Sequence, residues 1–355
     1  MIAVPVLTLV PGELGGSETY VRELLRALRR VGEHEYRVVL PPAAPDAAEG
    51  LPAVVAPEYR MARSIPQRLA AMSLASVRPG PLRHHLDDAQ AVHFPLTVAI
   101  PRTSLPSIVT LHDLQHLDLP GMFSRAERLF RAAFWHPALR RADRVIVMSE
   151  FVRERAVSRL GLDPGRITVI PMGVDQETLS PGNGAREPFL LYPARRWKHK
   201  NHERLFEAFS LVRKERPSLK LVLTGGGDFG DFAKLPDAVE SRGYVARGEL
   251  IDLMRHASAV VFPSLYEGFG LPPLEAMACG CPVACSNAGA LPEAVGDAAL
   301  LFDPRDPEAI AAAIREVLDE PERWSTRGLE HARAYSWDAT ARATDAVYSE
   351  LSTRA

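Results

Sequence analysis

A group of basic side chains is the clearest chemical signal in the sequence. Four of them follow the apolar segment Leu190–Tyr192, and they are Arg195, Arg196, Lys198 and Lys200. An arginine binds a phosphate group through paired hydrogen bonds, and a lysine ammonium acts as a point charge. The loop therefore favours a site for two phosphate groups, with a solvated basic loop as the alternative.

A second loop carries two carboxylates. Glu267 precedes Gly268 and Gly270, whose backbone amides are open to a ligand. Glu275 lies eight positions after Glu267, on a predicted helix whose first turn holds two prolines. Carboxylates in this position can accept hydrogen bonds from the hydroxyls of a sugar or a ribose. The alternative is one capping and one solvated glutamate.

A glycine pair opens the first predicted helix. Gly15 and Gly16 follow the first apolar segment and precede Ser17–Val31. Because they lack side chains, they let a ligand approach the backbone N–H groups at the positive end of the helix. The pair predicts a site for an anion such as a phosphate, and an ordinary glycine turn is the alternative.

One histidine ends a predicted strand. His112 directly follows Ser107–Leu111, at the carboxyl edge of the sheet, and Asp113 and His116 come after it. Ligands bind at this edge in folds of this kind. We expect His112 to take part in the chemistry, ahead of Asp113 and His116, and a structural histidine is the alternative.

The segment 225–230 matches G-x-G-x-x-G, the fingerprint of dinucleotide binding. The following residues 231–243 predict only a poor helix, broken by Pro236, with no clear strand. This context argues against a nicotinamide or flavin cofactor. We expect Gly225 to open a turn that borders a nucleotide pocket instead.

The elements that must position these residues follow from hydrophobic periodicity. Short apolar segments alternate with amphipathic ones, which is typical of βα units around parallel sheets. Strands of a first sheet are predicted at Ile2–Leu9, Tyr36–Leu40, Ala91–Phe94, Ser107–Leu111, Arg144–Met148 and Ile167–Ile170, with helices at Ser17–Val31, Ser124–Arg141 and Glu150–Leu160. Strands of a second sheet are predicted at Phe189–Pro193, Leu219–Thr224, Ala259–Pro263, Pro282–Ser286 and Ala299–Phe302, with helices at Asn201–Arg216, where Asn201 is the N-cap, and Pro307–Leu318.

The predicted fold class is therefore α/β, with two doubly wound parallel-sheet domains in tandem. An N-terminal domain is expected at 1–172, a linker at 173–187 and a C-terminal domain at 188–335. A last helix at 336–355 is expected to pack back on the N-terminal domain. Because such sheets bind ligands at the carboxyl ends of their strands, we expect a cleft between them.

The composition excludes several classes of protein. The chain has 355 residues, of which 46% are hydrophobic and 24% charged, and its formal net charge is -2, so no overall positive field favours nucleic acid. No segment reaches the ~20 apolar residues of a membrane span, and the N-terminus lacks a basic leader. Cys279, Cys281 and Cys285 lie close together, which favours core packing in a reducing, cytoplasmic compartment over a disulfide, with metal or redox chemistry as the alternative.

Taken together, these segments closely resemble the retaining GT-B glycosyltransferases of family 4, also called group 1, over essentially the whole chain. The match is most specific at 262–278, which carries the E-x7-E signature of the family, and at 289–298. The resemblance implies two Rossmann-like domains and a nucleotide-sugar donor whose pyrophosphate is bound by Arg195 and Lys200. Arg196 lies next to Arg195 in the sequence, so which of the two arginines binds the phosphate stays open. Glu275 would hold the donor ribose, and Glu267 would lie beside the sugar.

The resemblance also assigns roles around the donor. Gly15 and Gly16 match the N-terminal glycine loop of the family, and His112 matches its histidine near the reacting sugar. The other expected donor contacts are the amides of Phe269, Gly270 and Leu271, and the base-bordering Tyr244 and Val245.

The implied function is a hexosyltransferase that uses no metal or other cofactor. A GDP- or UDP-linked mannose or glucose would be transferred to a saccharide or lipid-linked acceptor. Peripheral membrane contact is a further expectation, because the basic segment Ser124–Arg141 and an acid-free stretch of arginines would attract anionic lipid. That stretch holds Arg60, Arg63, Arg68, Arg78 and Arg83. The alternatives are a solvated basic surface, a sugar-nucleotide epimerase of the same fold, and a non-catalytic nucleotide-sugar-binding module.

Overall fold

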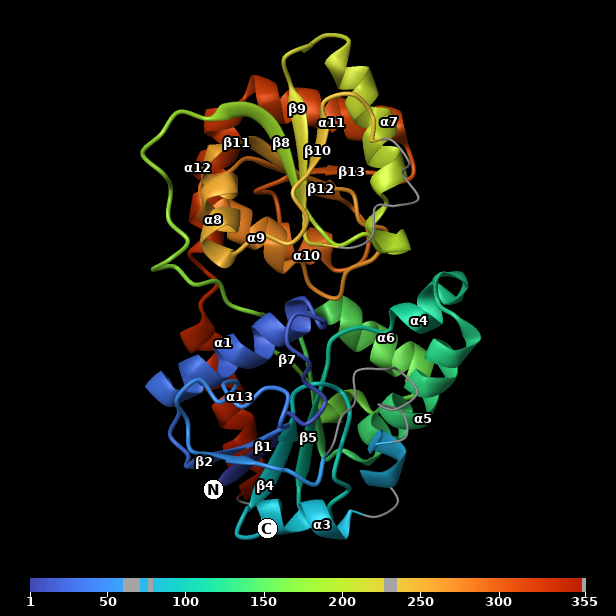
Figure 1. Ribbon diagram of the computed structural model, residues 1–355, viewed down its shortest axis with the longest axis vertical. Helices are drawn as coiled ribbons and strands as arrows, with labels where there is room; N and C mark the ends of the chain where they lie inside the picture. Colours follow the sequence, from blue (N-terminus) through green and yellow to red (C-terminus); the bar gives the residue numbers. More distant parts are fainter. Residues whose placement is uncertain (60–70, 76–78, 227–234, 353–355) are drawn as a thin grey trace. The chain divides into compact units, whose positions relative to one another are not determined.

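The computed structural model describes residues 1–59, 71–75, 79–226 and 235–352. The chain divides into two compact units. Unit 1 comprises Met1–Gly173 and Trp337–Ala355, and unit 2 comprises Val174–Ser336. Each unit is built on a parallel sheet flanked by helices (Figure 1).

Unit 1 contains a seven-stranded sheet in the order β3-β2-β1-β4-β5-β6-β7. All of its strand pairs are parallel. The strands are β1 (Ile2–Pro5), β2 (Tyr36–Leu40), β3 (Ala53–Val55), β4 (Ala91–Phe94), β5 (Ser107–Leu111), β6 (Arg144–Val147) and β7 (Ile167–Val169). Those from the middle of the sheet are almost wholly buried, as expected for a sheet covered on both faces.

The helices of unit 1 connect these strands. They are α1 (Gly16–Val31), α3 (Gly80–Arg83), η1 (His84–Leu86), α4 (Gln115–Asp118), η2 (Pro120–Met122), α5 (Arg125–Arg141), α6 (Glu150–Leu160), η3 (Pro164–Arg166) and the C-terminal α13 (Trp337–Ser352). Ser124 caps α5 by a reciprocal capping box with Glu127, and Ser149 caps α6. Two of the predicted helices thus begin where their capping residues require.

The C-terminal helix α13 packs against α1 in unit 1 (Figure 1). Tyr348 reaches the sheet, where its hydroxyl lies 2.7 Å from Nδ1 of the buried His93. The carboxylate of Asp345 accepts from the backbone N–H of Glu33 at 3.0 Å and also contacts the His34 ring. The last helix therefore completes the core of a domain that the chain had left at Gly173.

Unit 2 contains a six-stranded sheet in the order β10-β9-β8-β11-β12-β13, also parallel. Its strands are β8 (Glu187–Pro193), β9 (Lys220–Thr224), β10 (Val239–Ser241), β11 (Ala257–Phe262), β12 (Val283–Ser286) and β13 (Leu300–Phe302). Its helices are η4 (Lys198–Lys200), α7 (His202–Arg213), α8 (Arg247–His256), α9 (Leu271–Ala278), α10 (Leu291–Val295), α11 (Pro307–Asp319) and α12 (Pro321–Ala332).

Some sequence predictions need correction. The first strand ends at Pro5 rather than Leu9. The helices α8 and α12 were not predicted from the sequence. A strand does lie within 231–243, because β10 pairs in parallel with β9. Such a short edge strand, with the polar Glu240 and Ser241, carries no apolar signature. Residues 227–234 of the glycine motif and its sequel lie outside the described residues, as do Arg60, Arg63, Arg68 and Arg78.

The three cysteines are free and buried, as predicted for core packing. Burial raises the pKa of the Cys279 and Cys281 thiols to about 12, so both are held as neutral thiols. Among the described helices, none is long and apolar enough to cross a membrane.

Each sheet has a point where its strand order reverses, and ligands of doubly wound folds bind there. In unit 1 this point lies between β1 and β4, and in unit 2 it lies between β8 and β11. The loops after these four strands contain most of the predicted site residues.

Candidate active site

In unit 2, the basic loop and the glutamate loop meet. Nζ of Lys200, in η4 after β8, lies 2.6 Å from Oε1 of Glu267, in the loop after β11. Both side chains are largely buried, and the ammonium also lies 5.1 Å from the centre of the Phe262 ring. Two sequence-predicted residues thus form one ion pair at the switch point of the sheet.

Asn201 holds the two loops together. It is the N-cap residue of α7, as the sequence predicted, but it adopts a left-handed conformation, with φ of 62°, and its side chain makes no capping hydrogen bond. Its amide instead donates to the carbonyl oxygens of Pro263 at 3.0 Å and Pro304 at 2.7 Å. The Leu265 N–H donates to the His199 carbonyl at 2.7 Å. These buried bonds fix Lys200 relative to the glutamate loop.

Glu275 lies on α9 and is only 5% exposed. Its Oε1 is 2.7 Å from a guanidinium nitrogen of Arg247, at the start of α8. Sequence reasoning missed Arg247, because nothing near it in the sequence marks it as the partner of a glutamate 28 positions away. A carboxylate has about four lone-pair sites, so Glu275 keeps acceptor capacity for a ligand hydroxyl.

Two glycines shape the glutamate loop. Gly289 has φ of 65°, and a Cβ built there would lie 2.7 Å from both N and O of Glu267. Gly270, at the start of α9, has φ of 136°, and a Cβ there would meet Leu291 at 3.0 Å. Phe269 and Leu271 are buried on either side of it. The loop around Glu267 is therefore set by close backbone packing that other residues would disturb.

A third loop joins the site from β9. Gly225, with φ of 116°, packs so closely on the basic loop that a Cβ would lie 2.7 Å from the Ala194 carbonyl carbon and 2.9 Å from the Arg195 nitrogen. A Cβ on Gly226 would lie 3.6 Å from Cβ of Tyr244. Tyr244 is 76% exposed, which is unusual for an aromatic side chain and leaves its ring open to stack on a planar group. Val245 follows it and is half-buried.

Arg195 is half-buried, and its guanidinium lies 5.7 Å from the centre of the Trp197 ring. Arg196 is half-buried beside it. The loops after β8, β9 and β11 thus bring the basic residues, the glycine turn and Glu267 to one edge of the sheet.

In unit 1, His112 follows β5. Its Nε2 lies 2.8 Å from the carbonyl oxygen of Pro95, and its ring meets that of Tyr20 edge-on at 5.2 Å. A carbonyl only accepts hydrogen bonds, so Nε2 carries the proton and Nδ1 holds a lone pair. Burial lowers the pKa of His112, so the ring is neutral at neutral pH. It can accept a hydrogen bond from a hydroxyl.

The glycine pair lies at the start of α1. Gly15 is the N-cap residue, with φ of 56°, and Cβ atoms built on Gly15 and Gly16 would meet nothing within 4 Å. Glu18 in the first turn accepts from the Gly12 N–H at 2.7 Å. Open space therefore borders this helix end, as an anion site requires.

The weaker candidates have structural partners. Asp113 accepts from the Gln115 N–H at 3.0 Å and lies 3.5 Å from Arg131. His116 is buried, its Nε2 lies 3.2 Å from Nε2 of His136, and burial lowers its pKa to about 4. His116 is therefore a neutral core residue.

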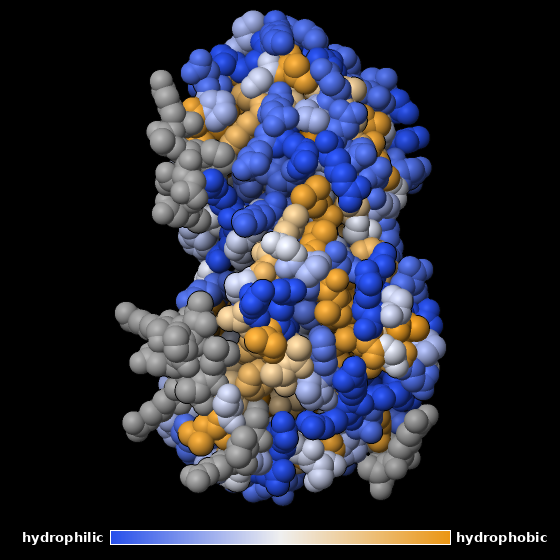
Figure 2. Space-filling model, turned by 90° about the vertical axis from the view of Figure 1, so that its right-hand side faces the viewer, coloured by the Kyte–Doolittle hydropathy of each residue, from blue (hydrophilic) through white to orange (hydrophobic). Residues whose placement is uncertain are grey.

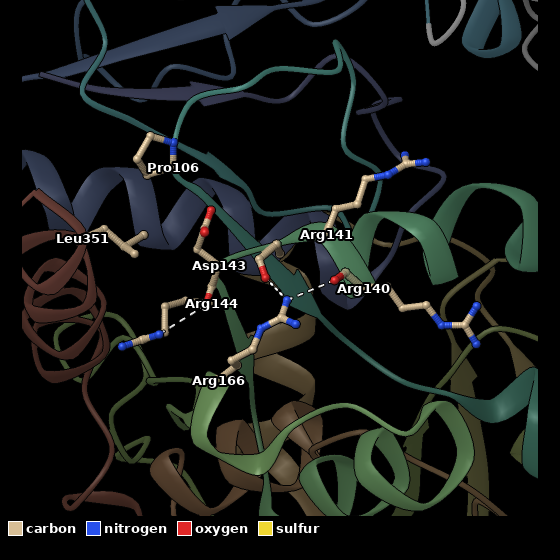
Figure 3. Close-up of a pocket in the computed structure, with 8 residues that line it drawn as sticks. Pro106, Arg140, Arg141, Asp143, Arg144, Arg166 and Leu351 are labelled. Carbon is tan, nitrogen blue, oxygen red and sulfur yellow. Dashed lines mark hydrogen bonds between the residues drawn. The ribbon is translucent and has the colours of Figure 1, made fainter. Parts of the chain in front are cut away.

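Other features lie apart from these residues. Four arginines of unit 1 surround a cavity of about 500 Å³ near the amino ends of β5 and β6 (Figure 3). Arg166 donates there to the carbonyls of Leu139, Arg140 and Ala142, which end α5, so its role is to close that helix. In the part of the chain that the structure describes, one group is close enough to hold a metal ion, namely Glu58, His84 and His85. It includes none of the predicted site residues.

Comparisons with known proteins identify the family and the fold of the chain. Residues 175–331 match the family Glycosyl transferases group 1, and residues 14–178 match Glycosyltransferase Family 4. The O-antigen chain mannosyltransferase B of Escherichia coli is 31% identical, over 69% of this chain and 70% of its own length. A D-inositol 3-phosphate glycosyltransferase of Kineococcus radiotolerans is 33% identical. The matched region covers 58% of this chain and 57% of the length of that relative. The structure of Anabaena HepE in complex with UDP and glucose superposes with a TM-score of 0.73 at 19% identity, over 98% of this chain and 99% of the other, and shows the same GT-B fold.

Proposed function

Because this chain belongs to the group 1 family of glycosyltransferases, enzymes that transfer sugars, we propose that it moves a hexose from a nucleoside-diphosphate sugar to a saccharide or lipid-linked acceptor, with retention of configuration. Mannose is the favoured sugar because the Escherichia coli relative is a mannosyltransferase, and glucose is the second candidate. The donor base is guanine or uracil.

The observation that carries this proposal is the Lys200–Glu267 ion pair at the switch point of unit 2. A lysine ammonium has three donors, and one bond to Glu267 leaves two for phosphate oxygens. The pairing holds the ammonium in place before a ligand arrives. Glu267 keeps a second oxygen for the hydroxyls of the sugar.

Departure of the nucleoside diphosphate develops negative charge on its β-phosphate. Lys200 and Arg195 would stabilise that charge without a metal ion. The neighbouring Arg196 offers a further guanidinium. Glu275, held by Arg247, would accept hydrogen bonds from the ribose, and the exposed Tyr244 would lie against the base.

In the proposed reaction the acceptor hydroxyl attacks the anomeric carbon on the face that the diphosphate leaves, and the departing phosphate oxygen takes the proton. Because attack and departure occur on the same face, the configuration at the anomeric carbon is retained. His112, neutral and with its lone pair on Nδ1, would bind a sugar hydroxyl rather than transfer a proton. Its task would be to hold the sugar while the bond to phosphate lengthens.

Unit 1 would also contact the membrane on which a lipid-linked acceptor resides. Helix α5 carries basic residues along its length. Figure 2 shows hydrophobic and hydrophilic groups intermixed on the side of unit 1 where α5 lies in Figure 1. Liposome cosedimentation with and without anionic lipid tests this contact, and binding that ignores the lipid charge would contradict it.

Thermal unfolding of the purified chain with UDP, GDP, ADP, dTDP or NAD tests the donor. A ligand at about 100 times its dissociation constant adds about 2.7 kcal/mol of stability. We expect a rise with UDP or GDP, and then release of that nucleotide from its hexose conjugate only with an acceptor present. Product without any acceptor would indicate an epimerase, and a rise with NAD alone would contradict the proposal.

A further inference from the structure

Unit 1 contains a cavity of about 440 Å³ at the switch point of its sheet. Residues after three strands line it, namely Thr8 and Val10 after β1, Leu96 to Val98 after β4, and His112 and Asp113 after β5. Residues of helix α5, Leu14 and Ser17 at the start of α1, and Met72 line the rest of it. The volume lies within the range of small-molecule sites in proteins.

The walls of this cavity are mainly apolar. Its apolar side chains include Val10, Leu14, Leu96, Val98, Phe130 and Trp135. Trp135 is held in place because the Arg131 guanidinium lies 4.5 Å from its ring centre and equally far from that of Phe123. The position of the aromatic side chain in this wall is therefore fixed by its contact with Arg131.

Several polar residues of the lining are satisfied within the protein. Ser124 and Glu127 bond to one another in the capping box of α5. Thr97 donates its hydroxyl to the Thr110 carbonyl at 2.7 Å and holds a left-handed conformation, with φ of 64°, that is rare for a β-branched residue. Asp113 is engaged by the Gln115 N–H and Arg131.

A sugar in a binding site makes many hydrogen bonds, whereas most of this lining is apolar and its polar groups, which include the hydroxyls of Thr8 and Ser17, are the minority. A hydrocarbon needs only apolar contact. His112 lies on the same wall, and its Nδ1 lone pair is the kind of group that orients a hydroxyl. The cavity therefore fits an apolar segment attached close to a hydroxyl-bearing group.

We propose that this cavity binds the hydrocarbon segment of an amphiphilic acceptor, so that the acceptor hydroxyl is presented next to His112. The inference rests on the proposed function for the identity of the reaction, and it narrows the acceptor to molecules with an alkyl or isoprenoid chain near the reacting hydroxyl. The hydrocarbon supplies affinity, and His112 supplies orientation.

The first test is direct binding of methyl, butyl, hexyl and octyl mannosides to the full chain, measured by calorimetry below their micelle concentrations. Each methylene that enters an apolar cavity should tighten binding about fourfold. We expect the gain to continue through hexyl. An affinity that does not depend on chain length would overturn the inference.

Two neighbouring residues of α5 provide a matched pair of variants. Phe130 lines the cavity, whereas Leu129 is exposed. Phe130→Ser should remove most of the chain-length dependence and Leu129→Ser should leave it unchanged. Equal losses in both would contradict the assignment to this cavity. Should Phe130→Ser not fold, Leu14→Ser in the partly exposed loop before α1 makes the same test.

Nucleotide binding separates this inference from the proposed function. Alkyl mannosides that bind with chain-length dependence, in a protein that no nucleoside diphosphate stabilises, would contradict the transferase proposal and leave the chemistry of the cavity intact. Stabilisation by UDP or GDP, together with mannoside binding that does not depend on chain length, would support the transferase proposal and contradict the role of the cavity.

Discussion

The two switch points of this molecule share a topology and differ in chemistry. In unit 2, the loops after β8 and β11 carry a largely buried ion pair, Lys200–Glu267, and Glu275 on α9 pairs with Arg247. In unit 1, the loops after β4 and β5 carry a neutral histidine and apolar walls. The parallel sheet fixes where a ligand can bind, and the side chains decide which ligand it is.

The difference also extends to how polar groups are tolerated. Unit 2 pairs its basic and acidic site residues across loops, as between Glu275 and Arg247. Unit 1 keeps its buried imidazoles neutral, because burial lowers the pKa of His93 to about 3 and that of His112 below its usual value. A charged donor and a neutral, partly apolar acceptor match this division.

The largest effect on turnover is expected from removing the ammonium group of Lys200 in unit 2. Lys200→Ala should lower turnover about 10²- to 10³-fold, because one donor to the developing phosphate charge is lost. Lys198→Ala, on the exposed side of the same turn η4, is the control and should change little. Steady-state kinetics and melting temperatures of both variants provide the measurement. Near-normal turnover of Lys200→Ala would remove the phosphate role.

A smaller loss is expected in unit 1. His112→Ala should lower turnover about 10- to 100-fold, a range typical of lost positioning contacts, and should leave stabilisation by the nucleotide unchanged. His112→Asn keeps an acceptor atom near the place of Nδ1 and should recover part of the rate. A weakened nucleotide effect in His112→Ala would show that the two sites are not separable in this way.

Gly289→Ala tests how the glutamate loop is held. The new Cβ would press on the Glu267 backbone, so we expect about 2 to 3 kcal/mol of destabilisation and about tenfold lower turnover. Gly161→Ala is matched, because Gly161 has the same φ of 65° but open space around it. It should cost about 1 kcal/mol and leave turnover unchanged. Chemical denaturation with activity assays distinguishes the two.

Mild acid is expected to lower stability through the buried histidines of both units. The pKa is lowered to about 3 for His93 and to about 4 for His116 and His202, so the folded chain leaves these rings neutral where the unfolded chain protonates them below about pH 6.5. Stability present above pH 6.5 is therefore lost as the pH falls toward 4. Two of these rings lie in unit 1, so hydrogen exchange at pH 7 and pH 5 should show a larger loss of protection there than in unit 2. Equal losses would weaken the contrast between the units.

Much of the fold was predictable because its signals are local. Short, mostly apolar segments such as Ala91–Phe94 agree with the observed strands, and Ser124 with Glu127 marks the start of α5. The strands β3 and β10 were not found, because edge strands need no apolar face. Asn201 was predicted correctly as the N-cap of α7, but its side-chain bonds to the carbonyls of Pro263 and Pro304 were not predicted, because both acceptors lie far along the chain.

For the site, the sequence by itself determined the residue types: a basic loop, two glutamates, glycines at strand ends and one histidine. It did so because each of these groups lies in a short segment with its own chemistry. The pairing of Lys200 with Glu267, the link from Arg247 to Glu275, and the apolar cavity beside His112 were decided by the tertiary structure alone. Each depends on loops that only the parallel order of the strands brings to one edge of a sheet. Local preferences of the chain do not determine which distant loops come together.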